Sequence, residues 1–307
     1  MRNIIFLIVM ISMVVGCGND SNNSVPSVSG NLSLNLTGLE PMTGQHYEGW
    51  VIVDGAAVTS GRFNVKTTGE VVLVDVAGNE TSTVGTGNIG IFNFVEGDNA
   101  PTDFILTIEP NGDTDPGPSA VHLTAGSFVG STANTTTTAT GGIGVAFGTA
   151  AGTYILATPT TAAIPGDDNQ GVWFLNAGAA SLTLPALPAE WAYEGWVVNT
   201  ATGTPVSTGV FSSATGADSN GAGPTAGPDG APGFPGEDFI TPPTILNGGN
   251  HLIVISVEPV PDFDPAPFAL KILSHAITSG QAAGTANNHT LGNINNGDSI
   301  TVNATLL

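Results

Sequence analysis

The amino-acid sequence predicts an all-β protein, with two tandem antiparallel β-sandwich domains that follow an N-terminal targeting segment. The chain of 307 residues is long enough for two domains. Its 42 glycines and 21 prolines favour many turns and short strands. Apolar residues alternate with period two in several blocks, and no window carries a sustained apolar stripe of period 3.6 with capping residues. Helix content is therefore expected to be very low.

The first residues have the pattern of a secretory signal. Arg2 supplies a positive charge, and residues 4–15 form an apolar run that only Ser12 interrupts. A run of this length is typical of the apolar region of a signal peptide and is too short to cross a bilayer as a helix. We therefore expect residues 1–16 to be a signal peptide and residues 17–30 to be a flexible tether that begins with Cys17.

Cys17 is the only cysteine of the chain, which excludes an intramolecular disulfide and a cysteine-based zinc site. It ends the sequence VVGC at 14–17, which resembles the bacterial lipobox: an apolar residue, a small residue, then the cysteine whose sulfur carries the diacylglyceryl group. The resemblance implies that Cys17 is lipidated and that the N-terminal lipid makes a membrane the partner of the chain. An ordinary signal peptide with a chance cysteine is the alternative.

The residues that follow this cysteine extend the same interpretation. By the bacterial sorting pattern, an aspartate after the lipidated cysteine retains a lipoprotein at the inner membrane, and this chain has Gly18 there. The resemblance therefore implies an extracytoplasmic lipoprotein of the outer membrane, on its periplasmic or surface side, in a host with two membranes. Residues 18–24 are polar and would hold the folded part away from the membrane.

The charge balance excludes one class of partner. Lysine and arginine total 4 against 25 acidic residues, which gives a formal net charge of −21 at pH 7. Binding of nucleic acid requires clustered lysine and arginine side chains that neutralise phosphates. We therefore expect no nucleic-acid partner.

Internal similarity is the strongest signal after the N-terminal segment, because four blocks recur in the same order in both halves. The blocks are YEGWVIV (47–53) with YEGWVVN (193–199), VTSGRF (58–63) with VSTGVF (206–211), FILTIEP (104–110) with IVISVEP (253–259), and DTDPGP (113–118) with DFDPAP (262–267). Their alternating apolar residues predict strands. We therefore place β-sandwich repeat 1 at 31–178 and β-sandwich repeat 2 at 179–307, each large enough to bury a core.

The remaining elements complete each repeat. Each half is expected to open on a strand with alternating leucines and to end on an Asp-containing turn followed by a strand. The opening strands are 32–36 and 182–184, and the closing strands are 172–175 and 300–302. Two segments without a counterpart, 131–142 and 213–238, are interpreted as insertions, the second as a mobile surface loop because it is rich in Gly, Pro and Ala.

The order of these blocks is similar to the extracytoplasmic C-terminal domain of anti-sigma-K factors, a small β-sandwich. The residues that carry the resemblance are Tyr193, Trp196, 205–211 and 257–259, with Tyr47, Trp50, Val58, Gly61, Phe63 and 108–110 in the first copy. The resemblance implies a fold and an extracytoplasmic location. Sigma-factor binding is not carried over, because a signal and lipobox stand where that family has a cytoplasmic region and a membrane helix, and a fold alone does not define a function.

Several residue types of the chain could serve in catalysis. The five histidines are His46, His122, His251, His275 and His289, and none has a triad or metal-ligand spacing. Duplicated acids are found at Glu48 with Glu194 and at Glu109 with Glu258. A glycosidase needs two carboxylates facing each other across a cleft, whereas duplicated positions of a tandem repeat more often serve the fold. No catalytic residue is predicted.

Two loops carry the best metal candidates. The pairs Asp113 with Asp115 and Asp262 with Asp264 could each share a calcium ion, which takes six to eight oxygen ligands. Each loop supplies only two carboxylates and lacks the glycine and the terminal glutamate of an EF-hand. Asx turns that cap a rigid connection are the alternative. The sequence therefore predicts no metal and no cofactor.

The tryptophans could stack on sugars or fill the core. Trp50 and Trp196 recur at one alternating position of the same strand, which favours the core for both. Trp191 has no counterpart in the first half and is the more plausible exposed aromatic. We therefore expect a non-enzymatic binding or structural module of the cell envelope, membrane-anchored and extracytoplasmic, with an envelope protein or glycan as ligand. The alternative is a hydrolase of envelope polysaccharide that uses the duplicated acids.

Overall fold

The structure is a computed structural model and describes residues 29–95, 99–164, 166–295 and 299–307. The predicted signal peptide at 1–16, Cys17 and most of the tether lie outside the described residues. Within them the all-β expectation is confirmed: antiparallel sheets make up the fold, and the only helical segments are three short 3-10 turns. None of these described helices is long and apolar enough to cross a membrane.

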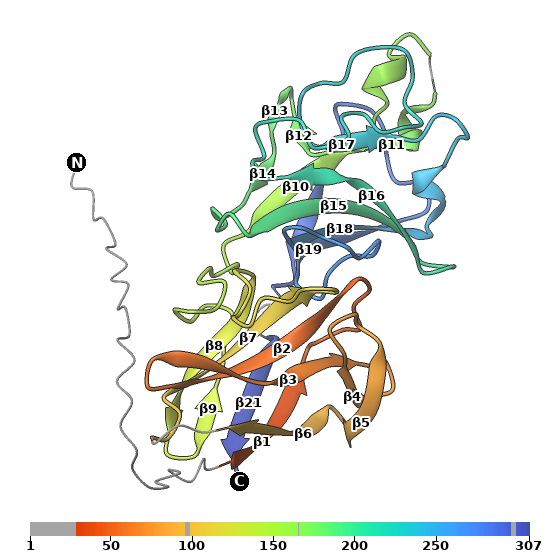
Figure 1. Cartoon of the computed structure of the whole chain (residues 1–307). Coiled ribbons are helices and arrows are strands. Elements are labelled where there is room, and N and C mark those ends of the chain that lie inside the picture. Colours follow the sequence, from red (N-terminus) through yellow and green to blue (C-terminus); the bar gives the residue numbers. More distant parts are fainter. Residues whose placement is uncertain (1–28, 96–98, 165, 296–298) are drawn as a thin grey trace, which may run out of the picture.

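Ten strands close into a barrel (Figure 1). Its strands are β1 Ser29–Thr37, β2 Gln45–Val53, β3 Ala56–Val65, β4 Val71–Val74, β5 Glu80–Thr86, β6 Ile89–Val95, β7 Asp103–Pro110, β8 His122–Val129, β9 Thr132–Asn134 and β21 Thr301–Leu306. They follow one another in the order β1-β21-β9-β8-β7-β2-β3-β4-β5-β6, and the pairing of β1 with β6 closes the barrel.

A nine-stranded sheet forms the second unit, which lies above the barrel in Figure 1. Its strands are β10 Ala151–Ile155, β11 Gly171–Trp173, β14 Leu182–Thr183, β15 Trp191–Asn199, β16 Thr204–Phe211, β17 Gly236–Asp238, β18 His251–Pro259, β19 Lys271–Ile277 and β20 Asn288–Asn293. The pair β12 Leu175–Asn176 and β13 Ala179–Ala180 forms a small separate sheet, and the 3-10 turns are η1 Pro159–Thr161, η2 Asp168–Gln170 and η3 Leu246–Gly248.

The alternating sequence patterns correspond to buried and exposed faces. Successive side chains of a strand point to opposite faces, so every second residue can enter the core. On β1 the leucines Leu32, Leu34 and Leu36 are buried, and on β6 the buried Phe92 and Phe94 alternate with exposed neighbours.

Three of the repeated blocks form strands, and together with the next strand of the chain they make the same four-stranded arrangement twice. In the barrel β2 lies between β3 and β7, and β8 follows β7; in the second sheet β15 lies between β16 and β18, and β19 follows β18. The pairing register shifts at the same place in both copies, between Gly49 and Trp50 and between Gly195 and Trp196. A β-bulge therefore recurs with the sequence repeat.

Sheet membership differs from the predicted division at residue 178. The closing strand β21 comes from the predicted second repeat but completes the barrel, with Leu32 paired to Leu306 and Leu36 to Val302. Conversely, β10 and β11 come from the predicted first repeat and belong to the second sheet. A short alternating strand shows which of its faces is buried, but its local pattern does not encode the sheet it joins.

Two segments interpreted as insertions also contribute strands. The segment 131–142 contains β9, which pairs with β21 in the barrel. The segment 213–238, interpreted as a surface loop, ends in β17, whose residues are buried and pair with β11. There Asp238 Oδ1 accepts a hydrogen bond of 2.7 Å from the indole of Trp173.

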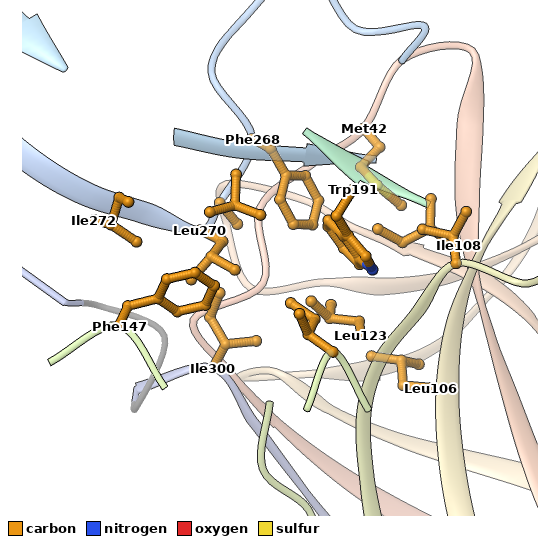
Figure 2. Packing of buried hydrophobic residues seen from close by; sticks show 14 of the residues in the cluster. Met42, Leu106, Ile108, Leu123, Phe147, Trp191, Phe268, Leu270, Ile272 and Ile300 are labelled. Carbon is orange, nitrogen blue, oxygen red and sulfur yellow. The ribbon is translucent and has the colours of Figure 1, made fainter. Parts of the chain in front are cut away.

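One hydrophobic core runs through both units (Figure 2). Trp191 lies in it near Met42 and Ile108 of the barrel, and its ring centroid is 5.9 Å from that of Phe268. Only 4% of Trp191 is exposed, so the expectation of an exposed aromatic is wrong. The reason is the position of this residue at the start of β15, where the second sheet meets the barrel. Trp50 and Trp196 are buried as expected.

Candidate functional site

One pair of the duplicated glutamates lies on the strands that also carry the duplicated tryptophans. Residues two apart on a strand share a face, so Glu48 lies beside Trp50 on β2 and Glu194 lies beside Trp196 on β15. All four side chains are buried. A carboxylate can be buried only where hydrogen bonds or a counter-charge compensate for its lost hydration.

In the barrel, a chain of hydrogen bonds leads from the tryptophan to a second glutamate. The indole of Trp50 donates to Thr107 Oγ1 over 2.9 Å, and the Thr107 hydroxyl donates to Glu109 Oε1. The backbone N–H of Ser119 donates to the same carboxylate oxygen over 2.9 Å. This network connects β2 to β7 and to the loop that follows β7.

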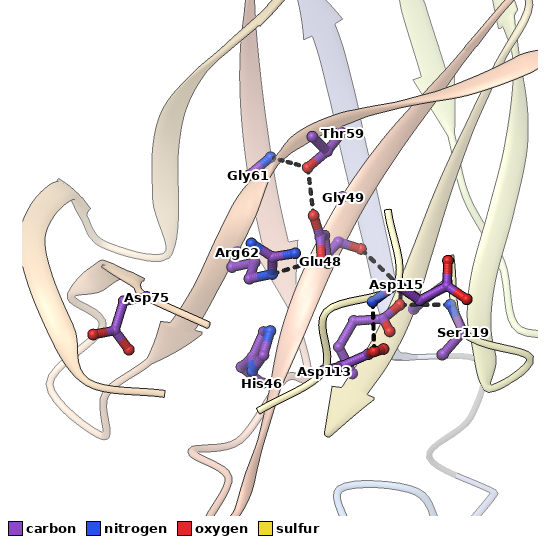
Figure 3. A network of polar contacts seen from close by, with 12 residues as sticks. His46, Glu48, Gly49, Thr59, Gly61, Arg62, Asp75, Asp113, Asp115 and Ser119 are labelled. Carbon is purple, nitrogen blue, oxygen red and sulfur yellow. Dashed lines mark hydrogen bonds and ion pairs between the residues drawn. The ribbon is translucent and has the colours of Figure 1, made fainter. Parts of the chain in front are cut away.

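Glu48 is compensated by a hydroxyl and a cation (Figure 3). Thr59 Oγ1 donates to Glu48 Oε1 over 2.5 Å, and Arg62 Nε lies 3.1 Å from Glu48 Oε2. Both partners come from β3, on which Arg62 is paired directly with Glu48. Burial raises the pKa of Glu48, while the Thr59 hydrogen bond and the Arg62 charge act in the opposite direction.

His46 is the second basic side chain at this place. Its Nδ1 lies 2.8 Å from Asn111 Oδ1, and on β7 the partner of His46 is Glu109. Burial lowers the pKa of His46; the Asn111 hydrogen bond raises it, and so do the charges of Glu109 and Asp113. The barrel copy therefore holds its three acids, Glu48, Glu109 and Asp113, beside two basic side chains.

The second sheet repeats the chain of hydrogen bonds. The indole of Trp196 donates to Ser256 Oγ over 2.8 Å, and the Ser256 hydroxyl donates to Glu258 Oε1. The backbone N–H of Phe268 donates to Glu258 Oε1 over 2.9 Å, as Ser119 does in the barrel. The Ser/Thr hydroxyl and the glutamate therefore have the same structural role in both copies.

The two basic side chains are missing from this second copy. Val210 pairs with Glu194 where Arg62 pairs with Glu48, and Ala192 pairs with Glu258 where His46 pairs with Glu109. Ser207 still donates to Glu194 Oε1. The other oxygen, Glu194 Oε2, is buried and has no hydrogen-bond partner among the described residues.

A third acid joins this copy. One carboxylate oxygen each of Glu194, Glu258 and Asp262 lies within 4.8 Å of the other two. We call these three residues the acidic cluster. It is the only group of three such potential metal ligands within the described part of the chain.

The electrostatics of the acidic cluster follow from burial and mutual repulsion. Burial raises the pKa of Glu194 to about 7, and the charge of Asp262 adds to the shift. Burial raises the pKa of Glu258 to about 8, again with a contribution from its acidic neighbours. Burial also raises the pKa of Asp262.

The Asp-x-Asp loops form the Asx turns that the sequence left as the alternative to calcium. Asp113 Oδ1 accepts from the N–H of Asp115, and Asp262 Oδ1 accepts from the N–H of Asp264, both over 2.9 Å. Asp264 also accepts a 2.8 Å hydrogen bond from the N–H of Thr43 in the barrel. The predicted pair therefore does not form one site: Asp262 belongs to the acidic cluster, and Asp264 links the second unit to the barrel.

The acidic cluster was not foreseen from the sequence, although its signal was present. The aligned blocks VTSGRF and VSTGVF differ at Arg62 and Val210, so the second copy loses a cation while it keeps its acids. The remaining histidines are elsewhere: His275 Nδ1, for example, lies 2.8 Å from the hydroxyl of Tyr154. Cys17, the predicted lipidation site, is outside the described residues.

Comparison with protein-family models, curated proteins and solved structures found no match to the chain. The resemblance to the C-terminal domain of anti-sigma-K factors therefore stays a prediction.

Proposed function

We propose that this protein is a membrane-anchored extracytoplasmic lipoprotein that serves the cell envelope as a non-enzymatic binding or structural module. The observation that carries the proposal is the position of Cys17: the only thiol of the chain follows a signal-like apolar run, with Gly16 between them. Acyl chains on a cysteine stabilise membrane attachment by about 0.8 kcal/mol for each buried methylene, and two or more chains give a stable anchor.

The tether and the sorting residue define the proposed location. Residues 18–24 are polar, so this part of the chain offers nothing apolar to pack against the barrel that starts at β1. Gly18 in place of an aspartate favours the outer membrane. The barrel and the second sheet would then stand in the periplasm or on the cell surface.

The hydrogen bonds of the duplicated acids support a non-enzymatic role. Glu48, Glu109, Glu194 and Glu258 are buried, and each accepts a hydrogen bond from a hydroxyl of its own repeat. A glycosidase needs two carboxylates that reach a sugar from either side of the scissile bond. Buried and internally bonded carboxylates are better suited to holding strands together.

The aromatic residues favour a protein over a glycan as the envelope partner. All four tryptophans are buried, and so are the three tyrosines, Tyr47, Tyr154 and Tyr193. These are the large polar-edged rings that most often stack on sugars. The formal net charge of −21 then favours a partner with a basic protein surface, which is electrostatically complementary to it.

The experiment that tests the anchor compares the wild type with Cys17→Ala. Cells that express either form are separated into soluble and membrane fractions, and the protein is detected in each. The wild type should stay in the membrane fraction, and the variant should leave it. A variant that remains membrane-bound after a high-salt wash would contradict the proposal.

A second experiment tests the hydrolase alternative. The full chain in detergent is incubated with chromogenic glycosides and with envelope polysaccharide, beside the Glu258→Gln and Glu109→Gln variants. We expect no turnover from the wild type. Turnover that either variant abolishes would replace the non-enzymatic proposal.

A further inference from the structure

The two copies of the repeat compensate their buried acids differently. In the barrel, the Arg62 guanidinium is an internal cation, 3.1 Å from Glu48 Oε2. In the second sheet the corresponding residue is Val210, and no lysine, arginine or histidine of the described residues forms an ion pair with Glu194. The second copy keeps the acids of the first and lacks their counter-charge.

A second observation points to a ligand at this place. Glu194 is 5% exposed, and its Oε2 atom has no hydrogen-bond partner among the described residues. Glu258, which is 1% exposed, and Asp262 each place an oxygen within 4.8 Å of a Glu194 oxygen. Leaving a buried carboxylate oxygen unpaired costs free energy, so a bound cation would stabilise this arrangement, in competition with the protons that the raised pKa values favour.

We propose that Glu194, Glu258 and Asp262 bind one divalent cation, Ca²⁺, which takes the place that Arg62 has in the barrel. Ca²⁺ binds oxygens at about 2.4 Å, so the three carboxylate oxygens, which lie within 4.8 Å of one another, are close enough together to share one ion. All three side chains offer oxygen, the donor that Ca²⁺ prefers, and none offers the nitrogen or sulfur typical of zinc sites. Asp262 is only half-buried, so water can reach the ion on this side and supply the remaining ligands.

Binding at this place would stiffen the contact between the two units. Asp262 begins the loop whose Asp264 accepts a hydrogen bond from the N–H of Thr43 in the barrel. A cation that joins this loop to β15 and β18 therefore also holds the loop against the barrel. The inference goes beyond the proposed function and does not depend on the lipid anchor.

The test is calorimetric titration of CaCl₂ into the full chain, purified in detergent and stripped of metals with a chelator. We expect one Ca²⁺ per chain and a higher melting temperature in its presence, because a ligand that binds the native state stabilises it. Glu194→Gln keeps the size and the Ser207 contact and should weaken binding at least tenfold. Glu48→Gln is the matched control in the barrel and should bind Ca²⁺ as the wild type does.

A second test places the arginine of the barrel at the corresponding position of the second sheet. Val210→Arg should abolish Ca²⁺ binding and raise the melting temperature in the absence of the ion, because it restores the cation of the first copy. Asp262→Asn, in a half-buried loop position, tests the site if Glu194→Gln fails to fold. Absence of Ca²⁺ binding by the wild type would overturn the proposal, and so would wild-type affinity in a folded Glu194→Gln or Asp262→Asn variant.

Luminescence of Tb³⁺ can show where in the protein the ion binds. Trp196 is linked to Glu258 through the hydroxyl of Ser256, so Tb³⁺ bound to the acidic cluster should luminesce when tryptophan is excited. Added CaCl₂ should displace the ion and quench the emission. Emission that survives in Val210→Arg would place the ion elsewhere and contradict the assignment.

Discussion

Arg62 pairs with Glu48 across β2 and β3, and its Nε atom lies 3.1 Å from Glu48 Oε2. The carboxylate is buried, whereas 31% of the Arg62 side chain is exposed. This ion pair is the feature that most clearly separates the two copies of the repeat, because Val210 stands at the same place in the other.

Arg62→Val should destabilise the barrel by leaving Glu48 buried without its cation. Removing one partner of a buried pair costs about 3–5 kcal/mol, and the exposure of Arg62 reduces the expected loss to about 1–3 kcal/mol. Urea unfolding of the full chain measures it. The double variant Arg62→Val/Glu48→Gln should recover part of the loss. A single variant as stable as the wild type would show that the pair contributes nothing.

Separate expression of the halves should fail to give two folded domains. A fragment that ends at residue 178 lacks β21, so β1 has no partner on one side and the barrel stays open. A fragment that starts at 179 lacks β10 and β11. Circular dichroism and thermal unfolding of each fragment, alone and after co-expression, test this expectation. A cooperative transition in either isolated fragment would contradict it.

Trp191→Ala should weaken the contact between the units. The residue is buried between Phe268 and side chains of the barrel, and truncation of a buried tryptophan costs about 3–5 kcal/mol. Trp191→Phe should cost less, and Val129→Ala, at an exposed position, should change little. Chemical unfolding of the three variants gives the comparison. Equal stability of Trp191→Ala and Val129→Ala would contradict the shared core.

Stability should fall as the pH rises toward neutrality, in part because of Glu237. Burial raises the pKa of this glutamate from 4.5 to about 7. The unfolded chain then loses its proton near pH 4.5 while the folded chain keeps it, so stability decreases between these two values and is level above them. Glu237→Gln should flatten this part of the profile, and the exposed Asp229→Asn should not. The melting temperatures of the three proteins, measured between pH 4.5 and about 7, test this expectation. Parallel profiles for the wild type and Glu237→Gln would show that Glu237 does not cause the pH dependence.

Much of the fold could be predicted from the sequence, because the repeated blocks carry local information. Period-two alternation correctly placed strands at 47–53 and 193–199, and the order of the blocks matches the order β2, β3, β7 and its counterpart in the second sheet. The sequence could not predict that β21, from the end of the chain, completes the barrel. Its alternation shows that Val302 and Ala304 are buried, but the choice of β1 and β9 as neighbours depends on tertiary packing.

The candidate site was predicted only in part. The sequence indicates the duplicated glutamates and the Asp loops only as separate groups, because glutamates of different strands and an aspartate of a loop have no fixed spacing along the chain. The pairing of β15 with β18 brings Glu194 and Glu258 together, and the turn after β18 adds Asp262. The difference between Arg62 and Val210 was visible in the aligned blocks, but its consequence required the burial of Glu194.

The central claim is that Cys17 anchors this protein to a membrane, and the intact mass of the purified wild-type chain tests it most directly. We expect a chain that begins at Cys17, without residues 1–16, and that carries the added mass of a diacylglyceryl group and any N-linked acyl chain. Cys17→Ala should lack this added mass. A wild-type chain that starts at Met1, or that is cut elsewhere and has no lipid, would contradict the claim.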